Sequence, residues 1–177
     1  MVQIEWIEKY LTEAEQMMYN NQVKEGLELL DSLLYDEPGY GSLHNHIGWA
    51  YLYYTSDTNR AELHLTMAIR FEELFAPPYL HLGVLYIRLG RYKDAITFLE
   101  RGLSKHQPNR VALLQHIAQA YELLGEWGQA IKAYKAAMLA SVVEHEIDSL
   151  TANIKRCRKK RVMLFLSGNK ERSYKSV

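Results

Sequence analysis

The sequence predicts an all-α fold, a stack of four similar helix pairs closed by a C-terminal helix, on three observations. Small residues recur every 34 or 35 positions, at Ala14, Gly48, Gly83 and Ala118. Large apolar residues lie three or four positions from these small ones, a spacing that places both on one helix face. The four prolines lie between the predicted helix pairs, where proline can begin a helix but cannot continue one.

Each repeat unit is predicted to hold two helices. A second small position follows the first by twelve or thirteen residues, at Gly26, Ala61, Ala95 and Ala130. Small side chains at both positions allow the paired helices to approach each other closely. Residues 1–6 are expected to extend the first helix. The four units follow one another over residues 7–40, 41–75, 76–110 and 111–144.

The turns inside the units are predicted from residues that tolerate a left-handed backbone. Asn21, Gly90 and Gly125 stand between the two helices of the first, third and fourth units. The second unit has no glycine at this point and has one additional residue, within the segment Thr55 to Asn59. We therefore expect a longer and more mobile turn over residues 55–59.

Residues 145–166 are predicted to form an amphipathic, basic helix that caps the last repeat. Ile147, Leu150, Ile154 and Cys157 recur at alternating three- and four-residue spacing, the pattern of one buried helix face. The ends of a repeat stack need such a cap, because each unit buries one face on its neighbour. Residues 167–177 are polar, have no periodicity and are expected to form a flexible tail.

The units resemble the tetratricopeptide repeat (TPR) family, whose pattern is W-x2-L-G-x2-Y, then A-x3-F, then P. The pattern falls on Tyr79, Leu82, Gly83, Tyr86, Ala95, Leu99 and Pro108 in the third unit, and on Ile117, Ala118, Tyr121, Ala130 and Tyr134 in the fourth. The first two units match less closely. The resemblance covers residues 7–144 and implies a right-handed α-solenoid of four TPR units plus the capping helix.

The resemblance also implies a binding surface, because the first helices of successive TPR units line a concave groove that holds peptides of partner proteins. Rigid aromatic rings are typical anchors of such interfaces, and Trp49 and Tyr53 lie one helical turn apart. The alternative that some groove positions belong to the core stays open. Carried onto this sequence, the groove positions are Met18, Asn45, His46, Trp49, Leu52, Tyr53, Leu80, His81, Val84, Ile87, Arg88, Gln115, His116 and Gln119, flanked by Leu11, Glu15, Tyr19, Glu122 and Leu123.

Some TPR domains hold the C-terminal carboxylate of chaperones with a set of lysine and asparagine side chains. The matching positions here carry Leu11, Glu15, Asn45, Pro77 and His81, with no lysine among them. A carboxylate needs cationic donors to offset the loss of its hydration. We therefore expect no chaperone-tail binding of this kind.

Three histidines, His46, His81 and His116, recur at an interval of 35 residues and are expected to form a row along the groove. Equivalent residues of adjacent packed helices lie about 8 to 10 Å apart, whereas nitrogen ligands lie about 2 Å from a zinc ion. A shared metal site therefore fails on distance. Structural hydrogen bonding and contact with a partner both stay open.

The charge is unevenly distributed, although 21 basic residues balance 21 acidic ones. Residues 1–40 carry nine acids and two bases, a net charge of −7, and residues 145–177 carry nine bases and three acids, a net charge of +6. This basic end is either the solvated face of the capping helix or a contact for a protein, a nucleic acid or an anionic membrane. Nucleic acid is the least favoured, because no aromatic residues alternate with the basic ones. The basic patch consists of Lys155, Arg156, Arg158, Lys159, Lys160 and Arg161.

Composition and motifs argue against several classes of protein. A chain of 177 residues with 48% apolar and 24% charged residues is typical of one globular domain. No apolar run approaches the roughly 18 residues of a membrane helix, and the acidic N-terminus is unlike a secretory signal. The lone Cys157 permits no internal disulfide, so a cytoplasmic location is expected.

The sequence has no phosphate-binding loop, no zinc-protease motif and no nucleophile elbow, so we expect neither catalysis nor a cofactor. The remaining features predict a noncatalytic adaptor or scaffold that binds a peptide segment of another protein in the concave groove. Two alternatives stay open. One is an anion-binding module that uses the C-terminal basic helix for nucleic acid or lipid. The other is an assembly protein that forms a homo-oligomer through its oppositely charged ends.

Overall fold

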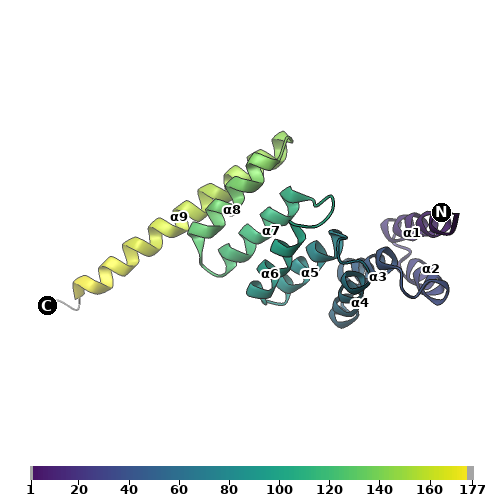
Figure 1. The fold of residues 1–177 in the computed structure, drawn as a ribbon. Helices are drawn as coiled ribbons and strands as arrows, with labels where there is room; N and C mark the ends of the chain where they lie inside the picture. The colour runs from purple at the N-terminus through teal and green to yellow at the C-terminus, as the bar shows by residue number, and fades with distance from the viewer. Residues whose placement is uncertain (1, 175–177) are drawn as a thin grey trace.

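A computed structural model describes the backbone of residues 2–174 and the side chains of residues 5–166. Within the described residues the chain is helical, and the helices follow one another along an elongated molecule with the two termini at opposite ends (Figure 1). The helices are α1 (Val2–Tyr19), α2 (Val23–Asp36), α3 (Gly41–Tyr54), α4 (Thr58–Phe71), α5 (Pro77–Arg88), α6 (Tyr92–Gly102), α7 (Arg110–Leu123), α8 (Trp127–Ala140) and α9 (Glu144–Tyr174).

The helices pack as consecutive pairs, which is the arrangement that the repeat predicts. Within each unit the two helices contact each other, and the second helix of each unit contacts the first helix of the next. The first helices also contact one another, α1 with α3, α3 with α5 and α5 with α7. These four helices therefore form one continuous layer, which we call the inner layer.

Close approach of paired helices depends on the small residues of the repeat. A Cβ atom placed on Gly48 would lie 2.6 Å from Cγ of Leu65, and one placed on Gly83 would lie 2.3 Å from Cδ2 of Leu99. Both leucines are fully buried. In the second and third units the pair is thus held by a large residue of the second helix that fits against a glycine of the first.

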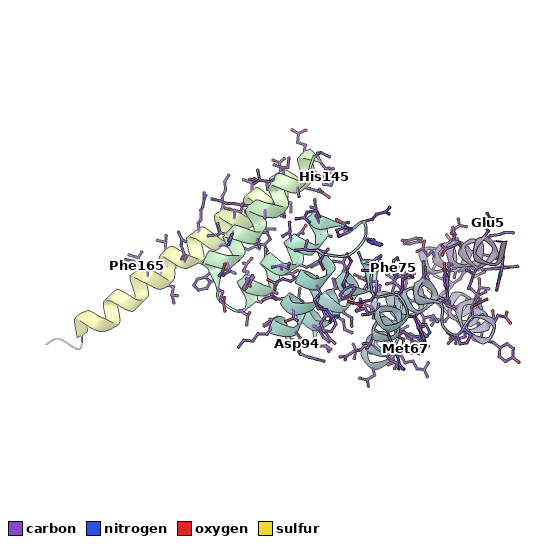
Figure 2. The ribbon with its side chains drawn as sticks, viewed as in Figure 1. Glu5, Met67, Phe75, Asp94, His145 and Phe165 are labelled. Carbon is purple, nitrogen blue, oxygen red and sulfur yellow. The ribbon has the colours of Figure 1, made fainter. Side chains whose placement is uncertain are left out.

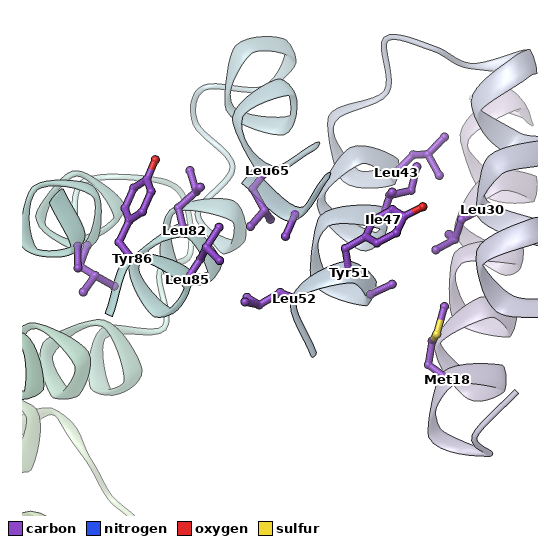
Figure 3. Packing of buried hydrophobic residues seen from close by; sticks show 14 of the residues in the cluster. Met18, Leu30, Leu43, Ile47, Tyr51, Leu52, Leu65, Leu82, Leu85 and Tyr86 are labelled. Carbon is purple, nitrogen blue, oxygen red and sulfur yellow. The ribbon is translucent and has the colours of Figure 1, made fainter. Parts of the chain in front are cut away.

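The main core runs through the first three units and into α7. Figure 3 shows part of it, where Leu52 of α3 and Leu65 of α4 meet Leu82 and Leu85 of α5. A second cluster joins α7, α8 and α9 and includes Tyr134, Leu150 and Ile154. Apolar contacts therefore continue from each unit to the next along the whole stack.

The turn of the second unit is not longer than the others, so that prediction is wrong. Three residues connect the helices in every unit, at 20–22, 55–57, 89–91 and 124–126. The additional residue extends α3 instead of the turn. Here Thr55 Oγ1 accepts the backbone N–H of Asp57 at 3.1 Å, and Asp57 Oδ1 accepts that of Arg60 at 3.0 Å. These side chains close the turn that Asn21, Gly90 and Gly125 close elsewhere with a positive φ.

Helix α9 packs on α8 through Leu150, Ile154 and Cys157, as the predicted stripe requires. It continues to Tyr174, so the predicted end at residue 166 is too early. Its C-terminal part extends beyond the other helices (Figure 1). The flexibility predicted for residues 167–177 stays a prediction, and residues 175–177 lie outside the described part.

Among the described helices, none combines the length and the hydropathy that a membrane span requires.

Candidate functional site

Four rings of the inner layer follow one another across three units and form the surface that we call the aromatic row: Tyr19, Trp49, Tyr53 and His81. The ring of Trp49 lies 6.0 Å from that of Tyr19 and 6.5 Å from that of Tyr53. The ring of Tyr53 lies 5.8 Å from that of His81, edge to face. Such contacts hold the rings in defined orientations.

The aromatic row is open to solvent at two points. Tyr19 is 70% exposed and Tyr53 is 41% exposed, while Trp49 and His81 are half-buried. Trp49 also rests edge to face on Tyr54, with the ring centroids 5.1 Å apart. The row is therefore a rigid apolar surface with accessible ring faces, which is the form of a protein-interface anchor.

Charged groups of opposite sign flank the row. The guanidinium of Arg88 lies 4.9 Å from the ring centroid of Tyr53, and its Nη1 donates to the carbonyl of Leu52 at 2.6 Å. On the side of the first unit, Oε1 of Glu15 lies 3.0 Å from Nε2 of His46. Burial raises the pKa of Tyr53, and the positive charge of Arg88 opposes that rise. A cation thus packs on Tyr53 of the row, and a carboxylate lies on the side of the first unit.

The histidine row that the sequence predicts is present on α3, α5 and α7. Nδ1 of His46 lies 2.7 Å from the carbonyl oxygen of Ser42, and Nδ1 of His116 lies 3.1 Å from Oε1 of Gln119. Nδ1 of His81 is buried with no hydrogen-bond partner. Burial, together with the neighbouring His46 and His116, lowers the pKa of His81 to about 4, and burial lowers the pKa of His116. His81 and His116 are therefore neutral at neutral pH.

A second histidine contact was not predicted. Nδ1 of His44 lies 3.1 Å from Nδ1 of His64, and Nε2 of His44 lies 3.0 Å from the carbonyl of Pro38. Because a carbonyl only accepts, the Nε2–H of His44 donates to it and Nδ1 accepts from His64. Burial, then the neighbouring His44 and Arg60, lower the pKa of His64 to about 4. This contact fastens α3 to α4 in the neutral form.

The structure divides the predicted groove residues into three groups. Met18, Asn45 and Leu52 are buried, so they are core residues and not contacts for a partner. For these three residues, the alternative that some groove positions belong to the core is correct. Tyr53, Arg88 and Gln119 are exposed, and the half-buried group comprises His46, Trp49, Leu80, His81, Val84, Ile87, Gln115 and His116. Leu80 lines a cavity of about 220 Å³ at the N-terminal ends of α5 and α7.

The basic patch of α9 is partly structural. Glu122 of α7 accepts from Nε of Arg156 at 2.8 Å, from its Nη2 at 2.7 Å and from Nζ of Lys160 at 2.8 Å. These hydrogen bonds, that of Arg156 first, lower the pKa of Glu122 to about 2 against the opposing effect of burial. Arg156 and Lys160 thus fasten α9 to the last repeat, while Lys155, Arg158, Lys159 and Arg161 are exposed.

Cys157 lies in the buried stripe, as predicted, and burial raises the pKa of its thiol to about 11. Such a thiol is a packing residue and not a nucleophile. Within the described residues no group of three or more histidine, cysteine, aspartate or glutamate side chains has the arrangement of a metal site.

Comparison of sequences identifies the repeat in the second half of the chain. Residues 79–111 and 113–144 each match the family model described as tetratricopeptide repeat. No curated protein matches this chain in sequence.

Comparison of structures extends the likeness to nearly the whole chain. The structure is similar to PilF of Pseudomonas aeruginosa, with a TM-score of 0.82 and 12% identity over 92% of this chain and 72% of that one. It is similar to PilW, described as a type IV pilus biogenesis factor, with a TM-score of 0.73 and 13% identity over 86% of this chain and 74% of that one. A TPR protein of Thermus thermophilus gives a TM-score of 0.69 and 20% identity over 84% of this chain and 79% of that one. At these identities the likeness confirms the predicted fold.

Proposed function

Because this chain is a tetratricopeptide repeat protein, we propose that it is a noncatalytic scaffold that binds a peptide segment of another protein across the aromatic row. Proteins of this family are generally interaction scaffolds, and two of the similar structures are PilF and PilW, the latter described as a pilus biogenesis factor. The family supports the general role. The choice of surface rests on the contacts of the inner layer.

The observation that carries the proposal is the exposure of Tyr19 and Tyr53 on both sides of the half-buried Trp49. Each ring is held by ring or cation contacts, so little side-chain entropy is lost when a partner covers them. A fold that needed these rings only for its core would bury them. Their exposure therefore favours contact with another molecule.

The chemistry of the row defines the class of segment that it binds. An apolar or aromatic side chain of the peptide packs on Tyr19, Trp49 and Tyr53. The neutral His81 adds no charge at its end of the row. Glu15 on the side of the first unit and Arg88 beside Tyr53 favour a segment that carries a basic group near Glu15 and an acidic group near Arg88.

Selection of peptides from a displayed library on the immobilised full chain tests the proposal. The selected peptides are expected to be rich in apolar and aromatic residues. Their affinity is expected to fall about 30-fold when Tyr19 and Tyr53 are both replaced by alanine, the size of a typical hot-spot loss. The matched control is Tyr35→Ala on α2, a tyrosine that is 91% exposed outside the inner layer.

Thermal unfolding of both variants checks that they fold. The proposal fails if a folded Tyr19→Ala, Tyr53→Ala double variant binds the selected peptides as tightly as the unaltered chain. It also fails if Tyr35→Ala reduces binding by the same factor, because the surface outside the inner layer then holds the peptide.

A further inference from the structure

Beyond residue 161, α9 carries an exposed apolar segment. The five successive residues 162–166 are 55–69% exposed. They lie on the part of the helix that extends past α8, where Phe165 is labelled in Figure 2. Apolar clusters of this kind on a soluble protein usually mark an interaction surface. The segment consists of Val162, Met163, Leu164, Phe165 and Leu166.

The distribution of these residues around the helix restricts what can cover them. With 3.6 residues per turn, five successive side chains point in every direction around the helix axis. A membrane surface covers one side of a helix that lies on it, and would leave part of the segment in water. A protein surface likewise covers one face of a docked helix, so the charges beside the segment decide which surface is favoured.

The charges next to the segment indicate the kind of protein surface. Lys155, Arg158, Lys159 and Arg161 are exposed directly before it, whereas Arg156 and Lys160 are engaged by Glu122. Residues 1–40 of the same chain carry a net charge of −7. The first unit is therefore a complementary partner for the basic residues of α9.

The aromatic row adjoins this acidic unit. Tyr19 belongs to α1 itself, and Glu15 lies one helical turn before it with its side chain 39% exposed. Apolar rings and acidic groups thus occur next to each other on the first units, as apolar and basic residues do on α9. The two surfaces match in both properties.

We propose that residues 162–166 of α9, the α9 extension, dock on the aromatic row of a second copy of this chain, with the exposed basic residues Lys155, Arg158, Lys159 and Arg161 beside them. The apolar residues pack on Tyr19, Trp49 and Tyr53, and the basic residues face the acidic first unit. The inference rests on the proposed function, because it names one occupant of the same surface. The C-terminal part of α9 and the first unit lie at opposite ends of the molecule (Figure 1), so the contact joins two molecules head to tail.

Sedimentation velocity of the full chain over a range of concentrations tests the inference. The unaltered chain is expected to exceed its monomer mass of 20.6 kDa as concentration rises. Association is expected to weaken as salt rises from 0.1 to 1 M, which shortens the Debye length from about 10 Å to about 3 Å. A Met163→Glu, Phe165→Glu variant is expected to stay monomeric. The matched control is Leu139→Glu, Val142→Glu, which replaces two apolar residues that are 85% and 96% exposed elsewhere.

A mixing experiment tests the head-to-tail geometry. One variant carries Met163→Glu and Phe165→Glu and keeps its aromatic row, and the other carries Tyr19→Glu and Tyr53→Glu and keeps its α9 extension. Each alone is expected to be monomeric, and a mixture is expected to form one dimer of about twice 20.6 kDa and nothing larger. Circular dichroism checks the helix content of both. If the double row variant does not fold, Tyr19→Glu alone replaces it, because that side chain is 70% exposed.

Any of these results would overturn the inference: a chain that is monomeric at every concentration, unchanged association of the α9 variant, loss of association in the matched control, or no dimer in the mixture. Vesicles of phosphatidylserine and phosphatidylcholine test the membrane surface as occupant. A chain that binds them through residues 163 and 165 while it stays monomeric also contradicts the inference.

If selected peptides bind the row of a monomeric chain, this inference fails and the proposed function stands. If the mixture dimerises but no peptide is selected, the inference stands and the proposed binding of a segment from a different protein fails.

Discussion

The two halves of the repeat array have the same architecture but differ in the chemistry of their inner layer. Residues 79–144 match the family model almost throughout, whereas the first two units lie outside the matched residues. Both halves nevertheless consist of helix pairs joined by three-residue turns. Buried packing positions therefore preserve this fold, while exposed positions are free to specialise.

Equivalent positions of the inner layer show the specialisation. Trp49 of the second unit corresponds to Val84 and Gln119 in the next two units, 35 and 70 residues later. Tyr53 corresponds in the same way to Arg88 and Leu123. Three of the four rings of the aromatic row, Tyr19, Trp49 and Tyr53, therefore belong to the half that is least like the family pattern, which is where a surface selected for one partner is expected.

Removing the large buried residue of one unit in each half tests whether the two halves are packed equally well. Leu65→Ala and Leu99→Ala are each expected to lower the free energy of unfolding by about 4 kcal/mol, because both leucines are fully buried against a glycine. Urea denaturation measures both losses. A loss at Leu65 of less than half that at Leu99 would show that the irregular unit is packed more loosely than the regular one.

A smaller effect, which depends on pH, is expected from the inner layer. The pKa values of His64 and His81 are about 4 in the folded chain, against 6.5 for an ordinary histidine. As pH falls from 6.5 towards 4, the unfolded chain takes up protons that the folded chain does not, so stability decreases over this interval. For His81 the loss between pH 7 and pH 4.5 is about 2 kcal/mol.

Urea denaturation at these two pH values measures this loss, and His81→Gln is expected to reduce it. The exposed His145, replaced in the same way, serves as the matched control. A stability that stays constant from pH 7 to pH 4.5, or a His81→Gln variant with the full pH dependence, would contradict the neutral, buried state of His81.

The smallest expected effect concerns the turn of the second unit. Asp57 caps α4 by accepting the N–H of Arg60, and Asn109 caps α7 by accepting the N–H of Ala112, both at 3.0 Å. Asp57→Ala and Asn109→Ala are each expected to lower the free energy of unfolding by about 1 kcal/mol. Thermal unfolding detects this difference. No loss at Asp57 alone would mean that the irregular turn is closed by something other than its side chains.

The helix pairs could be predicted from the sequence because they depend on short-range spacing. Small residues at a fixed interval, with leucine or tyrosine four positions away, specify which faces meet. The length of the turn at residues 55–57 could not be predicted in this way. The additional residue is accommodated within α3, and the hydroxyl of Thr55 and the carboxylate of Asp57 do what a positive φ does in the other units.

The candidate site was predicted less completely, because its members depend on contacts between units. The repeat pattern places Met18 and Leu52 in the groove, but Met18 packs against Gly26 of α2 and Leu52 belongs to the apolar core. His44 and His64 are 20 residues apart and meet only when α3 packs on α4. The pairing of Arg156 with Glu122 likewise requires the docked position of α9.

The fluorescence of Trp49 gives the most direct test of the aromatic row as a binding surface. The chain has three tryptophans, so replacing Trp6 and Trp127 by phenylalanine leaves Trp49 as the single reporter. When a selected peptide is added to this folded variant, the emission of Trp49 is expected to shift to shorter wavelength and saturate with the affinity measured for the unaltered chain. Saturable binding with no change in Trp49 emission would place the peptide elsewhere and contradict the proposal.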